Sequence, residues 1–150
     1  MTIQAASQKD LAIVERLLES EKLPTDIIAE SKGELWVIKK DDHVLGSGAL
    51  EFYGSDALLR SVVVAEESKG EGYGSRIIEH LEQEAAQRGV GTLWLLTETA
   101  EGFFGKRGYQ AVERNVIVNA GILDSSEFKH LCASTAVCMK KDVKAESTHQ

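Results

Sequence analysis

Residues 59–85 read LRSVVVAEESKGEGYGSRIIEHLEQEA and contain the most informative pattern in the chain. An apolar strand leads to the glycine-rich turn Lys69–Gly74, and an amphipathic helix follows. Glycines in such a turn adopt positive φ and let a ligand approach the backbone, while the first N–H groups of the helix carry the positive end of its dipole. We therefore predict a phosphate-binding turn, with Lys69 and Arg76 adding charge at its rim. A tight turn that uses glycine for geometry alone is the open alternative, because the pattern matches neither common nucleotide-binding motif.

On both sides of this stretch the hydrophobic pattern changes between strand and helix periods. Strands are predicted at residues 2–5, 34–39, 44–53, 58–65, 92–96, 109–114 and 135–140. Helices are predicted at residues 11–20, 75–88, 100–106 and 125–132, with a short one after Pro24. Ser7 and Asp10 stand at capping-box spacing before the first helix. Strands and helices in this order predict an α/β (α+β) fold in which helices cover a mixed sheet.

The composition bounds the kinds of function that the chain can have. Its 150 residues suit one domain, predicted over residues 1–140, followed by a polar and disordered tail at 141–150. A net charge of −7 argues against nucleic acid as a partner, although backbone N–H groups can still hold a small phosphorylated ligand. No apolar run is long enough to span a bilayer, and the N-terminus lacks the features of a signal peptide, so a cytoplasmic location is expected.

The cysteine and histidine residues do not predict a metal or catalytic site of their own. Cys132 and Cys138 are the only two cysteines, too few for a zinc site or a disulfide framework. Each is expected to be a buried thiol, and no metal is predicted. His43 and His80 are expected to face solvent.

Two motifs resemble segments of the GNAT (GCN5-related N-acetyltransferase) superfamily. Lys69, Gly72 and Gly74 stand where its central motif has Gln or Arg, then Gly, then Gly or Ala. The stretch AEGFFGKRGY at 100–109 is similar to its Ala-x-x-x-Tyr-x-Lys-x-Gly-Phe segment. The resemblance implies a GNAT domain whose mixed, mostly antiparallel sheet splays open between its fourth and fifth strands.

The same resemblance implies acetyl-CoA as cosubstrate. Its pantetheine arm would enter between the strands at 58–65 and 92–96, and its pyrophosphate would lie on the glycine-rich turn. The residues implied to contact it are Val62, Val63, Val64, Lys69, Gly70, Glu71, Gly72, Tyr73, Gly74, Ser75, Phe104 and Lys106.

Three further stretches look like the acetyltransferases of bacterial arsenic-resistance operons: residues 58–64, 95–117 and 125–139. Residues 96–104, LTETAEGFF, also resemble the acetyltransferase domain of N-acetylglutamate synthases. These resemblances imply direct transfer of an acetyl group to the amine of a small amino acid or a glutamate-like antimetabolite, with arsenic resistance as one role. The alternatives are a biosynthetic N-acetylglutamate synthase and a sensor that binds acetyl-CoA without turning it over. For the family, a homodimer built on the C-terminal strands would be unsurprising.

Direct transfer requires oxyanion donors and a group that takes the proton of the amine. The N–H group on the strand at Val64 is the predicted oxyanion donor. Glu51 ends one central strand and Glu98 follows another, so either is a candidate base. The alternative for both is a solvated carboxylate with no role in catalysis.

Arg60 lies in an apolar strand beside the expected cleft, and charged residues are rarely buried without a partner. A guanidinium can hold a carboxylate with two hydrogen bonds. We therefore predict that Arg60, together with Ser61 and Thr97, binds the acceptor. A salt bridge between Arg60 and a neighbouring glutamate is the open alternative.

Two positions depart from the family pattern. Phe104 stands where most relatives have the Tyr that protonates the departing thiolate, and Phe cannot donate a proton. Tyr73 and Tyr109 are the candidate replacements. Thr97 stands where many relatives have Asn.

Overall fold

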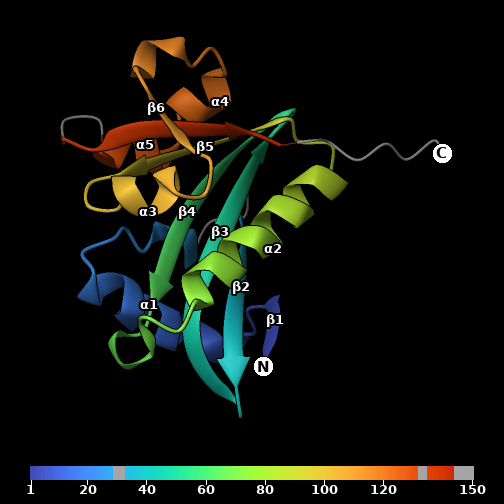
Figure 1. Ribbon diagram of the computed structural model, residues 1–150, viewed down its shortest axis with the longest axis vertical. Coiled ribbons are helices and arrows are strands. Elements are labelled where there is room, and N and C mark those ends of the chain that lie inside the picture. The colour runs from blue at the N-terminus through green and yellow to red at the C-terminus, as the bar shows by residue number, and fades with distance from the viewer. Residues whose placement is uncertain (29–32, 132–134, 144–150) are drawn as a thin grey trace. The chain divides into compact units, whose positions relative to one another are not determined.

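The computed structural model describes residues 1–28, 33–131 and 135–143. The strands are β1 (Thr2–Ala5), β2 (Gly33–Lys40), β3 (His43–Tyr53), β4 (Asp56–Val64), β5 (Thr92–Thr97), β6 (Gln110–Val112) and β7 (Val137–Asp142). The α-helices are α1 (Leu11–Ser20), α2 (Tyr73–Gln87), α3 (Glu101–Gly105), α4 (Ala120–Leu123) and α5 (Ser126–Leu131) (Figure 1). Short 3-10 turns are η1 (Gln8–Asp10), η2 (Asp26–Ile28), η3 (Glu66–Ser68) and η4 (Arg114–Val116).

The strands form one seven-stranded sheet in the order β1-β2-β3-β4-β5-β7-β6. The chain divides into two compact units, Met1–Glu51 with Ser61–Leu81, and Phe52–Arg60 with Glu82–Gln150. We call them the first and the second unit. β4 and β5 pair in parallel, whereas β1 with β2, β2 with β3, β5 with β7 and β6 with β7 pair antiparallel. The mixed α/β architecture predicted from the sequence is therefore confirmed.

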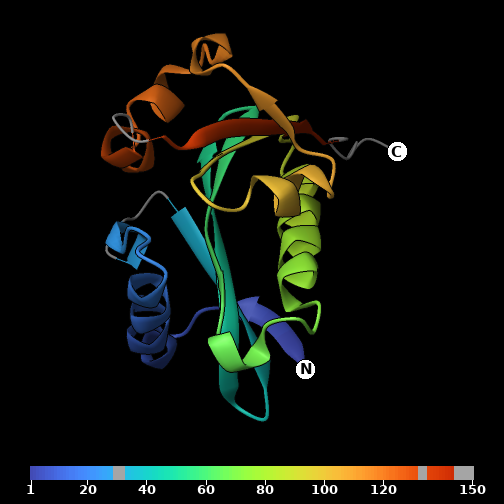
Figure 2. The same ribbon diagram turned by 60° about the vertical axis from the view of Figure 1, so that its left-hand side comes forward.

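In the first unit, helices cover both faces of the strands. Figure 2 shows β2 and β3 edge-on, with α1 on one side and the beginning of α2 on the other. On the α1 side, an apolar core forms because α1 and the strands present their apolar positions to each other. Its buried members are Val14, Leu18, Ile27, Val37, Val44, Ala49 and Val63.

The predicted capping box of Ser7 and Asp10 lies at the start of η1, the 3-10 turn that leads directly into α1. The carboxylate of Asp10 accepts hydrogen bonds from the Ser7 backbone N–H (2.8 Å) and the Ser7 hydroxyl (2.9 Å). It also pairs with Lys39 at 2.9 Å, on β2. Burial of Asp10 by itself raises the pKa, but the hydrogen bonds from Ser7 and Lys39 outweigh it and hold the pKa below its ordinary 3.8.

The second unit has its own apolar core. β5 lies between the start of β4 and β7, and β6 closes the edge. α4 and α5 contribute to the core, whose buried members are Leu58, Trp94, Leu96, Ile117, Ile122, Phe128, Ala136 and Cys138. Asn119 caps α4 by accepting from the Gly121 and Ile122 N–H groups. Its amide also donates to the Tyr53 carbonyl and the Asp56 carboxylate, at 2.8 and 2.9 Å.

The pairing register shows where β4 and β5 separate from each other. The register between them covers Asp56–Leu58 of β4 and Thr92–Trp94 of β5. Within the second unit, β4 continues through Arg60 and β5 continues to Thr97 beyond this paired segment. Pairing that covers only the start of each strand agrees with the predicted sheet that opens between its fourth and fifth strands.

Several boundaries differ from those predicted from the sequence. β7 extends through Asp142, so Lys141 and Asp142 belong to the sheet and not to the predicted tail; residues 144–150 lie outside the described residues. The short helix after Pro24 is a 3-10 turn, and α4 was not predicted. His80 does not simply face solvent, because its ring packs edge-on against Trp36 with centroids 5.8 Å apart.

Candidate functional site

The glycine-rich turn has the backbone geometry that the sequence predicts. Gly70 and Gly72 have φ of 86° and 82°, in the left-handed region that favours glycine. A Cβ at either position would meet no atom within 4 Å, so their conformation, and not crowding, requires glycine. α2 starts directly after Gly72, at Tyr73, and runs for 15 residues. A long helix that begins at an open, glycine-lined turn presents its unpaired N–H groups there, as an anion site requires.

Lys69 brings a positive charge to this turn. Its ammonium group pairs with Glu21 at 3.3 Å and with Glu66 at 3.4 Å. The hydrogen bond that Lys69 donates to Glu21, followed by the one it donates to Glu66, raises the pKa of Lys69 above its ordinary value. Because these pairs are exposed, they hold the side chain only weakly, and a phosphate can take the place of either carboxylate.

The middle of β4 contains a break in strand geometry. Ser61 is buried and has φ of 61°, which is rare for a residue with a side chain. Val63 points into the apolar core of the first unit, whereas Val62 and Val64 are half-buried. Val63 can therefore offer only its backbone to a ligand.

The two candidate bases have opposite environments. Glu51 ends the part of β3 in the first unit and is completely buried, and Gly33 is its register partner on β2. Glu98 follows β5 in the second unit and is exposed. Glu98 is therefore a solvated carboxylate, whereas Glu51 is not.

Arg60 is buried on β4 in the second unit, and its partner is on α5. One guanidinium nitrogen lies 3.5 Å from the Glu127 carboxylate and another donates to the Ser126 hydroxyl at 3.4 Å. Glu127 is itself buried. The open alternative of a salt bridge to a glutamate is what the structure shows.

The structure places Phe104 and Tyr109 in a buried aromatic cluster. Their rings meet edge to face with centroids 5.6 Å apart. The Tyr109 hydroxyl donates to the Glu82 carboxylate at 2.9 Å, and Lys141 binds the same carboxylate at 3.1 Å. Burial, and then the neighbouring Glu82 charge, raise the pKa of Tyr109 far above its ordinary 10.0. A hydroxyl held in this way stabilises α3 and β6, and it is a poor replacement for the missing proton donor.

Removing this hydroxyl is expected to change how stability responds to alkaline pH. A raised pKa in the folded state means that its contribution is complete below the unfolded pKa and is lost as pH rises above it. We expect the unfolding free energy to fall above pH 10 by about 1.4 kcal/mol per pH unit from this group. Tyr109→Phe should abolish that component and cost about 1–2 kcal/mol at pH 7. Urea denaturation from pH 7 to 11 measures both, and equal alkaline slopes in the two proteins would contradict the assignment.

The remaining candidates lie at the ends of elements in the second unit. The Thr97 hydroxyl oxygen accepts from the Ala100 N–H at 2.9 Å and so fixes the turn into α3. Its O–H group is still able to donate. Lys106 is exposed and ends α3. Cys138 is buried and burial raises its thiol pKa, whereas Cys132 lies outside the described residues.

The candidates therefore fall into two groups. The first unit holds Glu51, Ser61, Val62, Val63, Val64, Lys69, Gly70, Glu71, Gly72, Tyr73, Gly74 and Ser75. The second unit holds Arg60, Thr97, Glu98, Phe104 and Lys106.

Sequence reasoning missed the segment Gly46-Ser47-Gly48 on β3. A Cβ at Gly46 would lie 2.5 Å from the Val63 carbonyl oxygen, and the Ser47 hydroxyl donates to the Ser61 carbonyl at 2.9 Å. Glycines inside a strand pattern indicate a close approach of another backbone. That signal was present in the sequence, but only the structure shows that the approaching backbone is that of β4.

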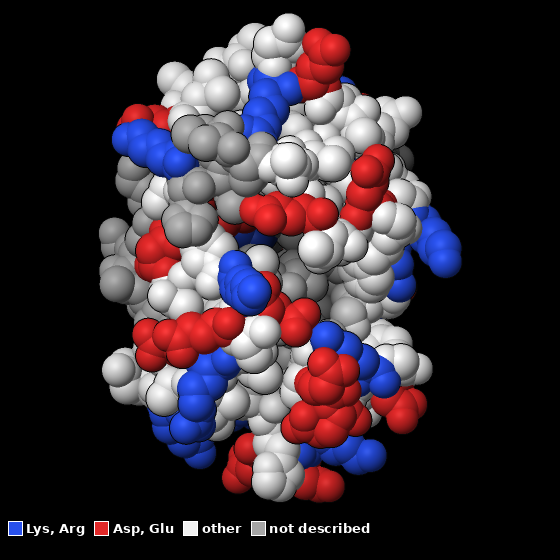
Figure 3. Space-filling view, turned by 90° about the vertical axis from the view of Figure 1, so that its left-hand side faces the viewer, with Lys and Arg blue, Asp and Glu red and all other residues white. Residues whose placement is uncertain are grey.

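The surface and the cavities add little to the site. On the face in Figure 3, acidic and basic side chains are interspersed among the described residues. Within the described ranges, no helix is long and apolar enough to cross a membrane, and no cluster of His, Cys, Asp or Glu could hold a metal ion.

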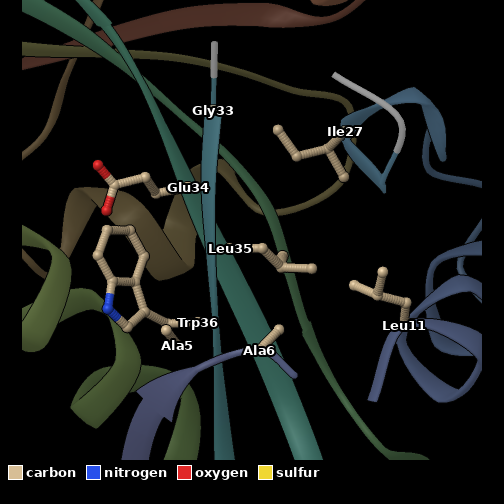
Figure 4. A pocket seen from close by; sticks show the side chains of 8 residues that line it. All are labelled: Ala5, Ala6, Leu11, Ile27, Gly33, Glu34, Leu35 and Trp36. Atoms are coloured by element: carbon tan, nitrogen blue, oxygen red, sulfur yellow. The ribbon is translucent and has the colours of Figure 1, made fainter. Parts of the chain in front are cut away.

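A pocket of about 250 Å³ lies at the edge of β2 in the first unit (Figure 4). Glu34 and Trp36 point to one side of the strand, and Leu35, Ile27 and Leu11 lie on the other. None of the candidate residues lines it; the lining residues are Ala5, Ala6, Leu11, Ile27, Gly33, Glu34, Leu35 and Trp36.

Among known proteins, acetyltransferases are similar to this chain in sequence. The chain is 31% identical over 94 residues to an uncharacterized N-acetyltransferase of Chlorobaculum tepidum, covering 62% of this chain and 60% of that protein. It is 33% identical over 75 residues to an amino-acid acetyltransferase of Ralstonia nicotianae, covering 49% and 17%. The chain thus spans less than two thirds of the length of these two relatives.

Structural comparison agrees. The N-acetylglutamate synthase of Neisseria gonorrhoeae, complexed with coenzyme A and L-arginine, superposes with a TM-score of 0.73 at 18% identity, over 95% of this chain and 33% of that one. The sequence model of the acetyltransferase (GNAT) domain matches residues 31–111, more than half of the chain. This match covers β3, β4, the glycine-rich turn and α2 in a single run, and the chain belongs to the GNAT acetyltransferase family.

Proposed function

We propose that this protein transfers an acetyl group from acetyl-CoA directly to the amine of a small amino acid. The observation that carries the proposal is the open turn at Gly70 and Gly72, which leads into a long helix in a chain of the GNAT family. Such a turn supplies backbone N–H donors and dipole charge to a pyrophosphate. Lys69 adds a cation at the same place.

The residues of the first unit can provide the chemistry of direct transfer. Acetyl-CoA supplies the thioester, whose C–S bond breaks as the amine nitrogen bonds to the carbonyl carbon. The N–H group of Val64 is our candidate donor to the developing oxyanion. Glu51 is the preferred base for the amine proton, because a buried carboxylate is shielded from the water that would otherwise compete for its hydrogen bonds. CoA leaves as a thiolate, which is a tolerable leaving group because the pKa of its thiol is about 8.5. The thiolate then takes its proton from water.

Two observations favour an amino acid as the acceptor. One curated relative is an amino-acid acetyltransferase, and a solved structure of the same fold is an N-acetylglutamate synthase. Arg60 adds no support to this choice, since its guanidinium is held by Glu127 and Ser126. We therefore propose the acceptor class from the relatives, and the buried ion pair as the role of Arg60.

An acceptor panel tests the proposal. Purified protein with acetyl-CoA is offered glutamate, aspartate, phosphinothricin and its arsenic analogue, a polyamine and a lysine peptide, and release of the CoA thiol is followed. Turnover confined to amino acids is the expected result. Preference for the arsenic analogue would point to arsenic resistance, and preference for glutamate to biosynthesis. CoA binding without turnover of any amine would leave a sensor in place of an enzyme.

The turn itself is tested by a pair of glycine variants. Gly72→Ala forces a side chain into the left-handed region, which costs about 1 kcal/mol and rearranges the phosphate-binding backbone. We expect CoA affinity, measured by isothermal titration calorimetry, to fall about tenfold. Gly54→Ala is the matched control, because Gly54 has φ of 75° and a Cβ there would also meet no atom within 4 Å. If both variants bind CoA equally well, the turn is not the phosphate site.

A further inference from the structure

A buried serine on β3 holds the strained point of β4. The Ser47 hydroxyl donates to the Ser61 carbonyl at 2.9 Å, and Ser47 has no exposed surface. Both residues lie in the first unit. The hydrogen bond is therefore shielded from water, which makes it stronger than a surface one.

Ser61 needs such a restraint. Its φ of 61° costs a residue with a side chain about 1–2 kcal/mol relative to ordinary strand geometry. Strained residues of this kind persist only where the surrounding structure fixes them, and they concentrate at functional sites. A hydrogen bond to the carbonyl of the strained residue restrains its ψ directly, which a packing contact to its side chain cannot do.

The Ser61 hydroxyl is also unusual. Its oxygen is buried and forms no hydrogen bond within the described part of the chain, although the residue is only 7% exposed. A buried hydroxyl without a partner costs free energy. A ligand that placed a polar group beside the hydroxyl would relieve that cost.

We propose that Ser47 is a positioning residue for acetyl transfer: it fixes Ser61 in the left-handed conformation and so presents the Ser61 hydroxyl and the following N–H groups of β4 to the bound substrates. The inference rests on the proposed function for its catalytic part. Its conformational part, the dependence of the φ of residue 61 on Ser47, stands apart from any activity.

Loss of the hydroxyl is the main test. Ser47→Ala is expected to lower kcat about tenfold, with the CoA affinity changed less than about threefold, because positioning affects the transition state more than binding. Ser47→Thr keeps the donor in a β-branched side chain that suits a strand, and should restore kcat to within about threefold. Ser20→Ala is the matched control, since the Ser20 hydroxyl also donates to a backbone carbonyl, that of Leu17, but on the exposed end of α1.

Repeating Ser47→Ala in a Ser61→Gly protein distinguishes a positioning role of Ser47 from an effect on stability alone. Ser61→Gly removes the hydroxyl and is expected to lower kcat by itself, but it adopts positive φ without strain. The kcat of the double variant is therefore compared with that of Ser61→Gly, and adding Ser47→Ala should cost less than about threefold. A full tenfold loss in that background would show that Ser47 does not act through residue 61 and would overturn the proposal. A lower melting temperature in Ser47→Ala with kcat unchanged would also overturn it. If Ser47→Ala fails to fold, Ser47→Cys replaces it, since its weak S–H donor has a similar size.

The activity-free arm is the crystal structure of Ser47→Ala. We expect residue 61 to leave the left-handed region in the variant; an unchanged φ would overturn the proposal. Should the wild type acetylate no amine, the proposed function fails, while this crystal structure still decides whether Ser47 holds residue 61.

Discussion

Replacing Arg60 by methionine is expected to lower the free energy of unfolding by about 3–5 kcal/mol. The substitution keeps most of the side-chain volume and leaves the buried carboxylate of Glu127 without the guanidinium that lies 3.5 Å from it. An uncompensated buried charge costs more than the ion pair contributes. Urea denaturation at pH 7 measures the loss.

A double-mutant cycle identifies the cause. The variant Arg60→Met, Glu127→Leu removes both charges and should recover most of the loss, because replacing a whole buried pair by apolar groups is close to neutral. Lys129→Met is the matched control: its ion pair with Asp124, at 3.0 Å, is largely exposed, so its loss should cost less than about 1 kcal/mol. A single-mutant loss as small as that of the control would show that Glu127 is not held by Arg60.

The same cycle separates the two interpretations of Arg60. If its role is structural, the double variant keeps the KM for the acceptor amine within about threefold of the wild type. If the guanidinium holds the acceptor carboxylate, the double variant folds well but its KM rises about a hundredfold, as expected from the loss of a charged hydrogen-bonded pair. The contacts to Glu127 and Ser126 favour the first outcome.

The parts of the structure that the sequence predicts are those determined by residues close together in the chain. The positive φ of Gly70 and Gly72 and the apolar face of α2 follow from local patterns, and both are confirmed. The capping box of Ser7 and Asp10 is local too. Each depends on residues within one or two turns of chain, where propensity and periodicity determine the outcome.

The parts that the sequence did not predict depend on partners far along the chain. The sequence marks Arg60 as an unusual charge, but its partner Glu127 lies on a different element. Tyr109 is a candidate proton donor by residue type, but its hydroxyl donates to the Glu82 carboxylate. Ser61 adopts a backbone conformation that serine rarely takes, so no local pattern could predict it. Tertiary contacts impose all three, and residue spacing alone does not report such contacts.

A substitution in the segment Gly46-Ser47-Gly48 of β3 is expected to have the second large effect on stability. We expect Gly46→Ala to lower the free energy of unfolding by about 3 kcal/mol. Its new methyl group would lie 2.5 Å from the Val63 carbonyl oxygen and 3.3 Å from the Val64 Cα, so the backbone of β4 has to move. In an unobstructed strand the same change would stabilise by about 0.4–1 kcal/mol through the unfolded state, so the sign itself is informative.

Gly48→Ala is the control two residues along the same strand. Its methyl group would meet the Ile77 Cγ2 atom at 2.5 Å and the Leu81 Cδ1 atom at 2.9 Å, both of which are side-chain atoms on α2 and not backbone atoms. Packed side chains adjust more readily than the paired backbone of a strand, so the expected cost is smaller, about 1–2 kcal/mol. Urea denaturation ranks the two variants, and a larger loss for Gly48→Ala would refute the close backbone contact at Gly46.

Gly46→Ala also connects stability with function. A displaced β4 moves the N–H group of Val64, our candidate oxyanion donor, whereas Gly48→Ala disturbs only side chains of α2. We therefore expect kcat to fall about a hundredfold in Gly46→Ala, the loss typical of a misplaced oxyanion donor, and less than about threefold in Gly48→Ala. Assays below the melting temperature of both variants keep unfolding out of the comparison. Equal kcat values in two folded variants would remove Val64 from the mechanism and leave the oxyanion to another donor.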